Sequence, residues 1–158
     1  MIIVSACLLG RNCKYSGENN KNSRIINILG NYPVLPVCPE ELGGLSTPRP
    51  PAEIIKGNGF DVLSGAARVF SCHGDDFTRH FSRGAEKVKE MAKKHQVSLA
   101  ILKERSPSCG VSQIYDGTFS GQTVPGCGVT TAGLRKAGIK VISEEDPLLE
   151  EIVLATKP

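Results

Sequence analysis

The amino-acid sequence predicts an α/β fold: a single-domain, three-layer, Rossmann-like parallel sheet with helices on both faces. Its 158 residues are a usual length for one domain. Two short apolar runs, residues 2–6 and 99–102, are typical of strands buried on both faces, and residues 34–37 and 139–143 form two further expected strands. Helical segments separate these runs, and such alternation favours parallel strands joined by right-handed crossovers.

Each strand and helix can be assigned from its local pattern. The expected strands cover residues 2–6, 34–37, 99–102 and 139–143. The expected helices cover residues 23–29, 76–95, a segment from Thr130 or Thr131 to Gly138, and a last segment opened by Asp146 and Pro147. The clearest helix is 76–95, because its apolar side chains recur at helical spacing.

Glycine and proline concentrate between these elements. The chain has 17 Gly and 10 Pro, which predicts long, shaped loops at the carboxyl edge of the sheet. Residues 43–59 are expected to form a rigid irregular loop, and residues 116–128 a glycine-rich excursion. Residues 61–63 and 68–70 are expected to pair as a small hairpin.

Charge and hydropathy exclude several classes of protein. Nineteen Lys and Arg against 16 Asp and Glu leave a net charge of +3, too small to argue for a protein that binds a nucleic-acid backbone. No apolar run approaches the ~18 residues of a membrane span, and the first six residues lack the features of a signal peptide. We therefore expect a cytoplasmic monomer or homodimer whose thiols are reduced or metal-bound.

Three of the six cysteines occupy equivalent places in the predicted fold. Cys7 and Cys38 directly follow expected strands, and Cys109 follows a third strand within a short loop. Because ligands bind beyond the carboxyl ends of parallel strands, these thiols are expected to converge. No C-x-x-C pair occurs, which argues against a zinc ribbon or a thioredoxin motif. Three thiolates could instead hold zinc, Cu(I) or an iron-sulfur cluster with one open iron, and the role of Cys13 stays open.

Polar side chains near these cysteines are candidates for chemistry. Glu40, just after the second of the three cysteines, suits general acid or base catalysis. Ser106 and Ser108 can orient a carbonyl-like group, whereas Lys103 and Arg49 can neutralise developing negative charge. Ser108, Lys103 and Arg49 are therefore expected to bind substrate.

A structural explanation stands beside each of these roles. A free cysteine is most often a small buried hydrophobic residue. Glu40 and Glu41 can simply be acids in the first turn of a helix. Lys103 can be a solvated surface residue, and Arg49 can serve only to hold the proline-rich loop.

Several motifs together resemble one known family. They are Ser5-Ala6-Cys7-Leu8-Leu9-Gly10, Cys13-Lys14-Tyr15-Ser16-Gly17, Val37-Cys38-Pro39-Glu40, Thr47-Pro48-Arg49-Pro50-Pro51-Ala52-Glu53 and Ser106-Pro107-Ser108-Cys109-Gly110. In combination they are similar to the domain of unknown function 523 family, which includes bacterial thiouracil desulfidases. The resemblance extends over nearly the whole chain, from residue 2 to about residue 143.

The resemblance implies a [4Fe-4S] cluster held by Cys7, Cys38 and Cys109, with a fourth iron that binds the sulfur of a thiocarbonyl substrate. It also implies Glu40 as the catalytic carboxylate and Ser106 as the catalytic hydroxyl. In the expected non-redox reaction, water activated by the carboxylate replaces the sulfur of a small thiolated base of the 2-thiouracil type, which leaves a carbonyl and sulfide.

Two other classes of function stay open. One is a non-catalytic metal-binding or iron-sulfur-binding module. The other is a metal-free enzyme in which Cys109 or Cys38 attacks the substrate. The absence of histidine from the three cysteine motifs disfavours this last class, because a cysteine nucleophile is commonly activated by a neighbouring base.

Overall fold

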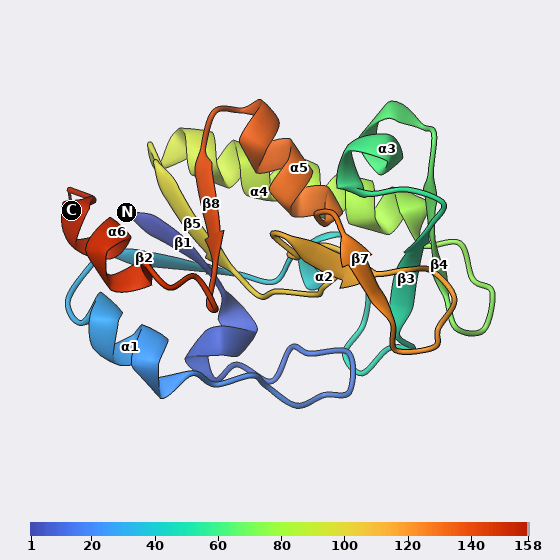
Figure 1. The fold of residues 1–158 in the computed structure, drawn as a ribbon, viewed down its shortest axis with the longest axis horizontal. Coiled ribbons are helices and arrows are strands. Elements are labelled where there is room, and N and C mark those ends of the chain that lie inside the picture. The colour runs from blue at the N-terminus through green and yellow to red at the C-terminus, as the bar shows by residue number, and fades with distance from the viewer. Residues whose placement is uncertain (158) are drawn as a thin grey trace.

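The computed structural model describes residues 1–157, and a four-stranded parallel sheet lies at its centre (Figure 1). The strands are β1 (Ile2–Ser5), β2 (Val34–Val37), β5 (Leu99–Leu102) and β8 (Lys140–Ser143), in the order β2-β1-β5-β8. Every neighbouring pair is parallel. The two central strands, β1 and β5, are buried at every residue, as their unbroken apolar runs predict.

Helices cover both faces of this sheet. They are α4 (Thr78–Lys94) and α5 (Val129–Lys136) on one face, and α1 (Ser23–Leu29) and α6 (Leu149–Ala155) on the other. Successive residues of β1 point to opposite faces, so that Ile2 and Val4 pack with α1 and α6, whereas Ile3 packs with α4 and α5. The three-layer α/β prediction is confirmed.

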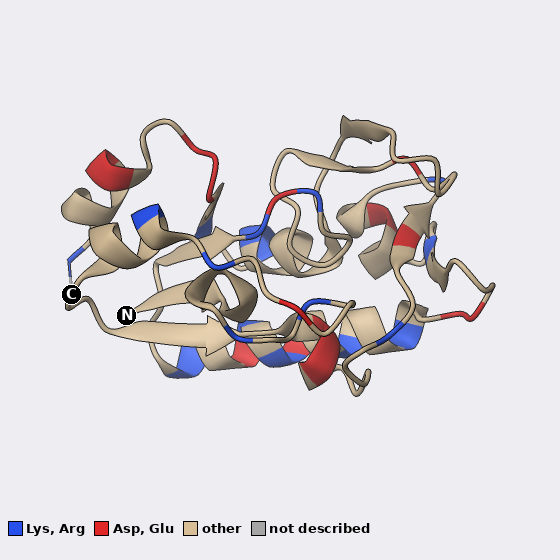
Figure 2. Cartoon of the chain, turned by 90° about the horizontal axis from the view of Figure 1, so that it is seen from below, with Lys and Arg blue, Asp and Glu red and all other residues tan. Residues whose placement is uncertain are grey.

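Charge is distributed on the outside of these layers. Figure 2 shows basic and acidic residues interspersed along α4 and in the loops near the sheet edge. The apolar stripe of α4 faces the sheet, with Phe81, Val88 and Ala92 buried. None of the helices within residues 1–157 is long and apolar enough to span a membrane.

A short helix, α2 (Pro39–Leu42), follows β2 and packs very closely on α4. A Cβ atom on Gly84 of α4 would lie 2.0 Å from the carbonyl oxygen of Pro39, and one on Gly43 would lie 2.0 Å from that of His80. Any side chain at either position would force the helices apart. This close approach fixes the start of α2 at the carboxyl edge of the sheet.

Two small antiparallel sheets lie beyond that edge. In one, β3 (Ala52–Ile55) pairs with β4 (Arg68–Ser71); in the other, β6 (Gln113–Tyr115) pairs with β7 (Thr123–Pro125). The prediction of an irregular loop over residues 43–59 is therefore wrong where β3 forms. The edge pairing of β3 depends on residues more than ten positions away, which its own composition does not indicate.

The predicted hairpin between residues 61–63 and 68–70 is also wrong. The first of these segments lies in a helix, α3 (Gly59–Ser64), and β4 pairs with β3 instead. Asn58 and Asp61 explain the helix, because the side chain of each accepts a hydrogen bond from the backbone N–H of the other. This reciprocal cap stabilises a helical first turn.

Two predicted helix starts differ from the structure. The helix α5 begins at Val129 without a threonine cap, because its first N–H groups bind carbonyl oxygens of residues 107–108. The helix α6 begins at Leu149, because Asp146 caps a separate turn by accepting the N–H of Leu148 at 2.8 Å.

Candidate active site

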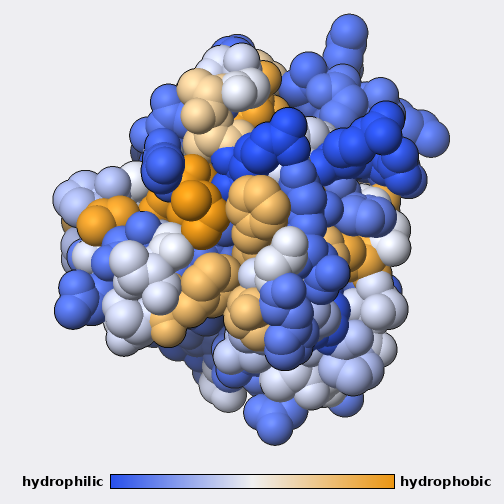
Figure 3. Space-filling view, turned by 90° about the vertical axis from the view of Figure 1, so that its right-hand side faces the viewer, coloured by the Kyte–Doolittle hydropathy of each residue, from blue (hydrophilic) through white to orange (hydrophobic). Residues whose placement is uncertain are grey.

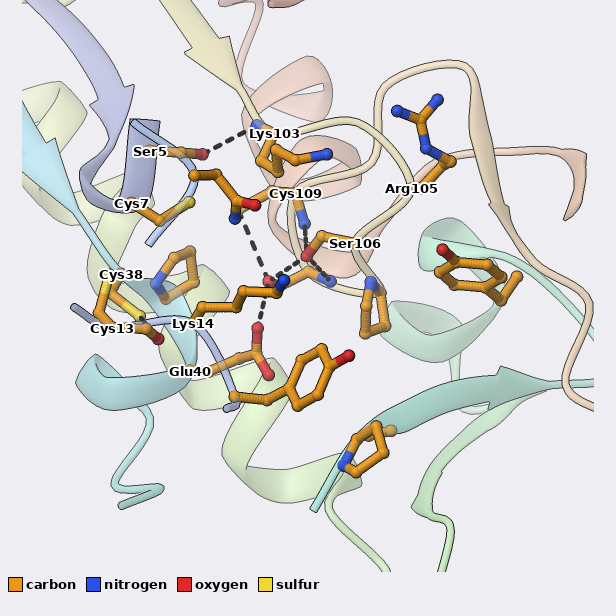
Figure 4. Close-up of a pocket in the computed structure, with 18 of the residues that line it drawn as sticks. Ser5, Cys7, Cys13, Lys14, Cys38, Glu40, Lys103, Arg105, Ser106 and Cys109 are labelled. Carbon is orange, nitrogen blue, oxygen red and sulfur yellow. Dashed lines mark hydrogen bonds between the residues drawn. The ribbon is translucent and has the colours of Figure 1, made fainter. Parts of the chain in front are cut away.

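A cavity of about 500 Å³ opens where β1, β2 and β5 end (Figure 4). On one side lie four thiols from the parallel-sheet edge, which we call the thiol wall: Cys7, Cys13, Cys38 and Cys109. On the other side lie residues of the small antiparallel sheets and their connections, which we call the aromatic wall: Glu53, Tyr115 and Phe119. The structure thus brings side chains from distant parts of the sequence into one cavity.

Each thiol of the thiol wall comes from a different segment. Cys7 lies in the 3-10 turn η1 (Ala6–Leu9) directly after β1, and Cys38 is the residue between β2 and α2. Cys109 lies in the loop after β5. Cys13 follows η1 and is packed with Cys7 and Cys38, with only 3% of its surface exposed. The structure gathers the three predicted ligands, whose role as ligands stays a prediction.

Neighbouring groups divide these thiols into two kinds. Hydrogen bonding with Cys13 lowers the pKa of Cys7 to about 7 and also lowers the pKa of Cys38. The hydrogen bonds with Cys38 and Cys7, together with burial, raise the pKa of Cys13, so that Cys13 keeps its proton. Burial raises the pKa of Cys109 to about 12. The lowered pKa values of Cys7 and Cys38 favour the thiolate form that metals need, whereas Cys109 would release a proton on ligation.

A chain of hydroxyl groups connects Glu40 with the loop that carries Cys109. Ser108 Oγ donates to Glu40 Oε2 at 3.2 Å and lies 3.0 Å from Ser106 Oγ. Ser106 Oγ in turn accepts the backbone N–H groups of Ser108 and Cys109 at 3.2 and 3.0 Å (Figure 4). The carboxylate contacts Ser108 directly and reaches Ser106, the predicted catalytic hydroxyl, only through it.

Glu40 and Glu41 face different surroundings although they are neighbours in α2. Glu40 lines the cavity. Glu41 pairs with Arg11 at 3.1 Å and accepts the hydroxyl of Thr47 at 2.6 Å. The geometry therefore favours Glu40 as the carboxylate that can meet a substrate.

Arg49 is almost fully enclosed, with 3% of its side chain exposed, and its N–H groups donate hydrogen bonds to acceptors of the protein itself. Nε donates to Glu40 Oε1 at 3.2 Å. One terminal nitrogen donates to the carbonyl of Ser46 and to the hydroxyl of Thr47, and the other donates to the carbonyl of Cys13 at 2.8 Å. These contacts favour a positioning role, with Arg49 holding Glu40 and the Cys13 loop, over the predicted contact with substrate.

Lys103 lines the cavity but is also engaged by protein acceptors. Its Nζ lies 3.1 Å from Glu144 Oε1 and donates to the carbonyl of Glu104 at 3.0 Å. Its backbone N–H donates to the buried Ser5 Oγ at 3.0 Å. The positive charge of Lys103 is therefore largely neutralised by Glu144.

A buried carboxylate holds the loop that carries Ser106, Ser108 and Cys109. Oε1 of Glu104 accepts three backbone N–H groups at 2.7 to 3.0 Å, from residues 111–113. Burial opposes ionisation of Glu104, but these hydrogen bonds outweigh it, and the net result is a lowered pKa. These hydrogen bonds hold residues 111–113 against the Glu104 carboxylate.

Comparisons with known proteins agree with this geometry. Residues 2–146 match the family model of 2-thiouracil desulfurase. The chain belongs to this family. It is 48% identical over 146 residues to the uncharacterized protein YbbK of Bacillus subtilis (strain 168), with 92% of this chain and 97% of YbbK covered.

A solved structure extends the similarity to the fold. This member of the 2-thiouracil desulfurase family is similar to the [4Fe-4S]-dependent thiouracil desulfidase TudS, with a TM-score of 0.85 and 41% identity. The match covers 98% of this chain and 97% of TudS. The family resemblance drawn from the cysteine motifs is confirmed.

The donors in the cavity of this 2-thiouracil desulfurase family member suit a cluster better than a single ion. Within residues 1–157, no group of three His, Cys, Asp or Glu side chains is arranged to hold one metal ion. The four thiols instead surround a shared space. A [4Fe-4S] cluster binds each ligand at a different iron, so its thiolates do not need to meet at one point. Soft thiolate donors are also the ligands that such clusters select.

Sequence reasoning missed several side chains that line the cavity. Lys14 follows Cys13 in one of the family motifs, and that position was an available signal. Tyr115 and Phe119 gave no signal, because they reach the cavity through a strand pair that the sequence does not predict. Glu53 ends another motif, but its approach to the cavity depends on the unpredicted β3.

Proposed function

We propose that this protein is a desulfidase that replaces the thiocarbonyl sulfur of a small thiolated nucleobase, of the 2-thiouracil type, by oxygen and releases sulfide. One observation carries the proposal: a single cavity contains three thiols from different segments of the chain and the hydrogen-bonded chain Glu40–Ser108–Ser106. The thiols can hold a centre that binds sulfur, and the carboxylate can activate water. Membership of the family and the likeness to TudS support the same activity.

Cys7, Cys38 and Cys109 would hold a [4Fe-4S] cluster, the group on which TudS depends. When bound, such a cluster would supply a Lewis-acidic iron that binds the substrate's sulfur and polarises the C=S bond. Three ligands leave one iron available for this contact. Cys13 contacts Cys7 and Cys38 and hydrogen-bonds with both.

Glu40 would act as the base of the hydrolytic step. Its carboxylate, held by Arg49 and Ser108, takes a proton from water as the water oxygen adds to the thiocarbonyl carbon. The carbon–sulfur bond then breaks, sulfide leaves, and the substrate nucleobase carries a carbonyl where it had a thiocarbonyl. Ser108 and Ser106 orient the reacting group. Thiocarbonyl plus water equals carbonyl plus hydrogen sulfide, so no external electron is required.

The metal-free alternative finds less support in the cavity. Of the two candidate nucleophiles, Cys109 is buried with its pKa raised to about 12 and is a poor nucleophile without a metal, which leaves only Cys38. Within residues 1–157, no histidine lines the cavity to activate it. The non-catalytic alternative does not account for a buried arginine that holds a carboxylate towards the cavity.

We further propose that the enzyme acts in the cytoplasm, as a monomer or homodimer, on a free base. Six cysteines without a disulfide among residues 1–157, and a site suited to an oxygen-sensitive cluster, fit a reducing compartment. The net charge of +3 is too small to argue for a nucleic-acid partner.

The test is anaerobic purification and reconstitution with ferrous iron and sulfide, followed by incubation with 2-thiouracil in water labelled with oxygen-18 and without reductant. We expect a brown protein that releases sulfide and produces uracil with one labelled carbonyl. If the protein binds the cluster but releases no sulfide from 2-thiouracil, the result would support a non-catalytic iron-sulfur-binding module. Full activity of the iron-free protein would instead establish the cysteine-nucleophile mechanism.

A further inference from the structure

Four cationic side chains line the cavity, and three of them are neutralised by carboxylates of the same chain. The three pairs are Arg49 with Glu40, Lys103 with Glu144, and Arg105 with Glu145. The fourth cation is Lys14, and within residues 1–157 no carboxylate lies within salt-bridge distance of its ammonium. Lys14 is therefore the positive charge of the cavity that remains available to a ligand.

The position of Lys14 is set by its own loop. Its backbone N–H donates to the carbonyl of Glu18, and its carbonyl accepts the N–H of Gly17 at 2.8 Å, which closes a tight turn directly after Cys13. The ammonium lies 5.6 Å from the centre of the Tyr15 ring, a cation–π contact. Figure 4 shows its side chain extending from this turn into the cavity, on the side of Glu40 and Ser106.

We propose that Lys14 is the cation that contacts the bound base, in place of Lys103 and Arg49; this inference rests on the proposed desulfidase function. A base of the thiouracil type carries a ring carbonyl oxygen besides its thiocarbonyl. Negative charge also spreads into the ring when water adds to the thiocarbonyl carbon. An ammonium has only N–H donors, so it suits both the carbonyl oxygen and the developing charge.

The substitution Lys14→Met tests this contact, because it keeps most of the unbranched side chain and removes the ammonium with its charge. With reconstituted protein, we expect uracil, the unreactive product, to bind roughly 10-fold more weakly by calorimetry, since a hydrogen bond to a charged group is lost. KM for 2-thiouracil should rise by a similar factor. Iron content should stay as in the wild type, and Lys14→Arg should recover most of the affinity.

Lys21→Met is the matched control, because Lys21 is exposed and does not line the cavity. It should bind uracil as the wild type does. Wild-type affinity in Lys14→Met, or a larger loss in Lys103→Met at equal iron content, would overturn the inference. If the wild type binds uracil but releases no sulfide from 2-thiouracil, the proposed function fails, whereas a loss of uracil binding in Lys14→Met would still support the contact.

Discussion

The two walls of the cavity are built from different kinds of secondary structure. The thiol wall lies at the ends of parallel strands whose sheet is covered by helices on both faces. The aromatic wall belongs to two-stranded antiparallel sheets that have one buried side and are exposed in places, with Phe119 and Val124 each 39% exposed. Figure 3 shows apolar side chains gathered among polar ones on the face seen from that end of the molecule. A rigid wall suits a metal centre, whereas a more exposed wall suits contact with the substrate.

A buried carboxylate anchors a loop in each wall, but not equally. Next to the thiol wall, Oε1 of Glu104 accepts four backbone N–H groups, from residues 105 and 111–113, and its other oxygen accepts the hydroxyl of Ser112. Glu53 accepts the N–H groups of Gly117 and Phe119 at 2.9 and 3.2 Å, both on Oε1. The loop of the thiol wall is therefore held by more bonds. We therefore expect substitutions near the thiol wall to affect the cluster and stability, and substitutions in the aromatic wall to affect substrate binding.

The largest effect is expected from the predicted ligands in the thiol wall. Cys7→Ser, Cys38→Ser and Cys109→Ser should each lose the cluster and all measurable desulfidase activity, because a serine hydroxyl is a much poorer ligand for iron than a thiolate. Iron analysis, visible absorbance and sulfide release after reconstitution measure this.

Cys72→Ser and Cys127→Ser are the controls. Cys72 is exposed at the mouth of the cavity, and Cys127 is buried outside it, so both variants should keep cluster and activity. Loss of iron in Cys127→Ser with normal iron in Cys109→Ser would show that the cluster is held elsewhere.

The next effect is expected at Glu40, at the border between the walls. Glu40→Gln keeps the size of the side chain but cannot accept a proton, and removal of a general base typically slows a reaction by about 10²- to 10⁴-fold. We expect normal iron content with sulfide release at least ~100-fold slower. Glu41→Gln changes the neighbour that pairs with Arg11 outside the cavity and should stay near the wild-type rate. Equal, near-wild-type rates of sulfide release in the two variants would show that Glu40 has only a structural role.

The difference between the walls also explains what could be predicted from sequence. The central strands β1 and β5 are short runs of buried apolar residues, and the ends of β1, β2 and β5 place Cys7, Cys38 and Cys109 at one edge. By contrast, β7 is exposed at all three residues, and β3 follows two prolines. Such strands form through their pairing partners, and pairing between distant segments leaves little trace in local composition.

The assignment of the basic residues shows the same limit. Lys103 and Arg49 have the right residue types and places near the cysteines, so sequence reasoning selected them for substrate binding. Their carboxylate partners, Glu144 and Glu40, lie 41 and 9 positions away in the chain. Which cation remains unpaired depends on these tertiary contacts, and Lys14 could be singled out only once the contacts were known.

A moderate effect is expected in the aromatic wall. Stacking of a base on an aromatic ring is worth ~1 to 3 kcal/mol, and the exposure of Phe119 favours the lower end. Phe119→Ala should raise KM for 2-thiouracil about fivefold, with kcat and iron content nearly unchanged. Phe119→Tyr keeps the ring and should behave as the wild type. A large fall in kcat with constant KM would place Phe119 among the groups that act on the reacting atoms.

The smallest effect, on stability alone, compares the two anchoring carboxylates. The pKa of Glu104 is lower in the folded protein than the unfolded value of about 4.3, so its stabilising contribution is complete above that pH and is lost as the pH falls through the folded pKa. Glu104→Gln should lower the free energy of unfolding at pH 7 by about 1 to 3 kcal/mol, and the variant should lose less additional stability below pH 4.3 than the wild type.

Urea denaturation of the iron-free proteins between pH 3 and pH 7, under reducing conditions, measures both quantities. Glu53→Gln is the matched variant, because Glu53 is also buried but accepts only two backbone N–H groups, both on one oxygen. Its loss at pH 7 should be below about 1 kcal/mol, since fewer hydrogen bonds to the charged carboxylate are weakened. Equal destabilisation by the two substitutions would mean that the loops of both walls are held with similar strength, and the structural contrast between the walls would then rest on their strands alone.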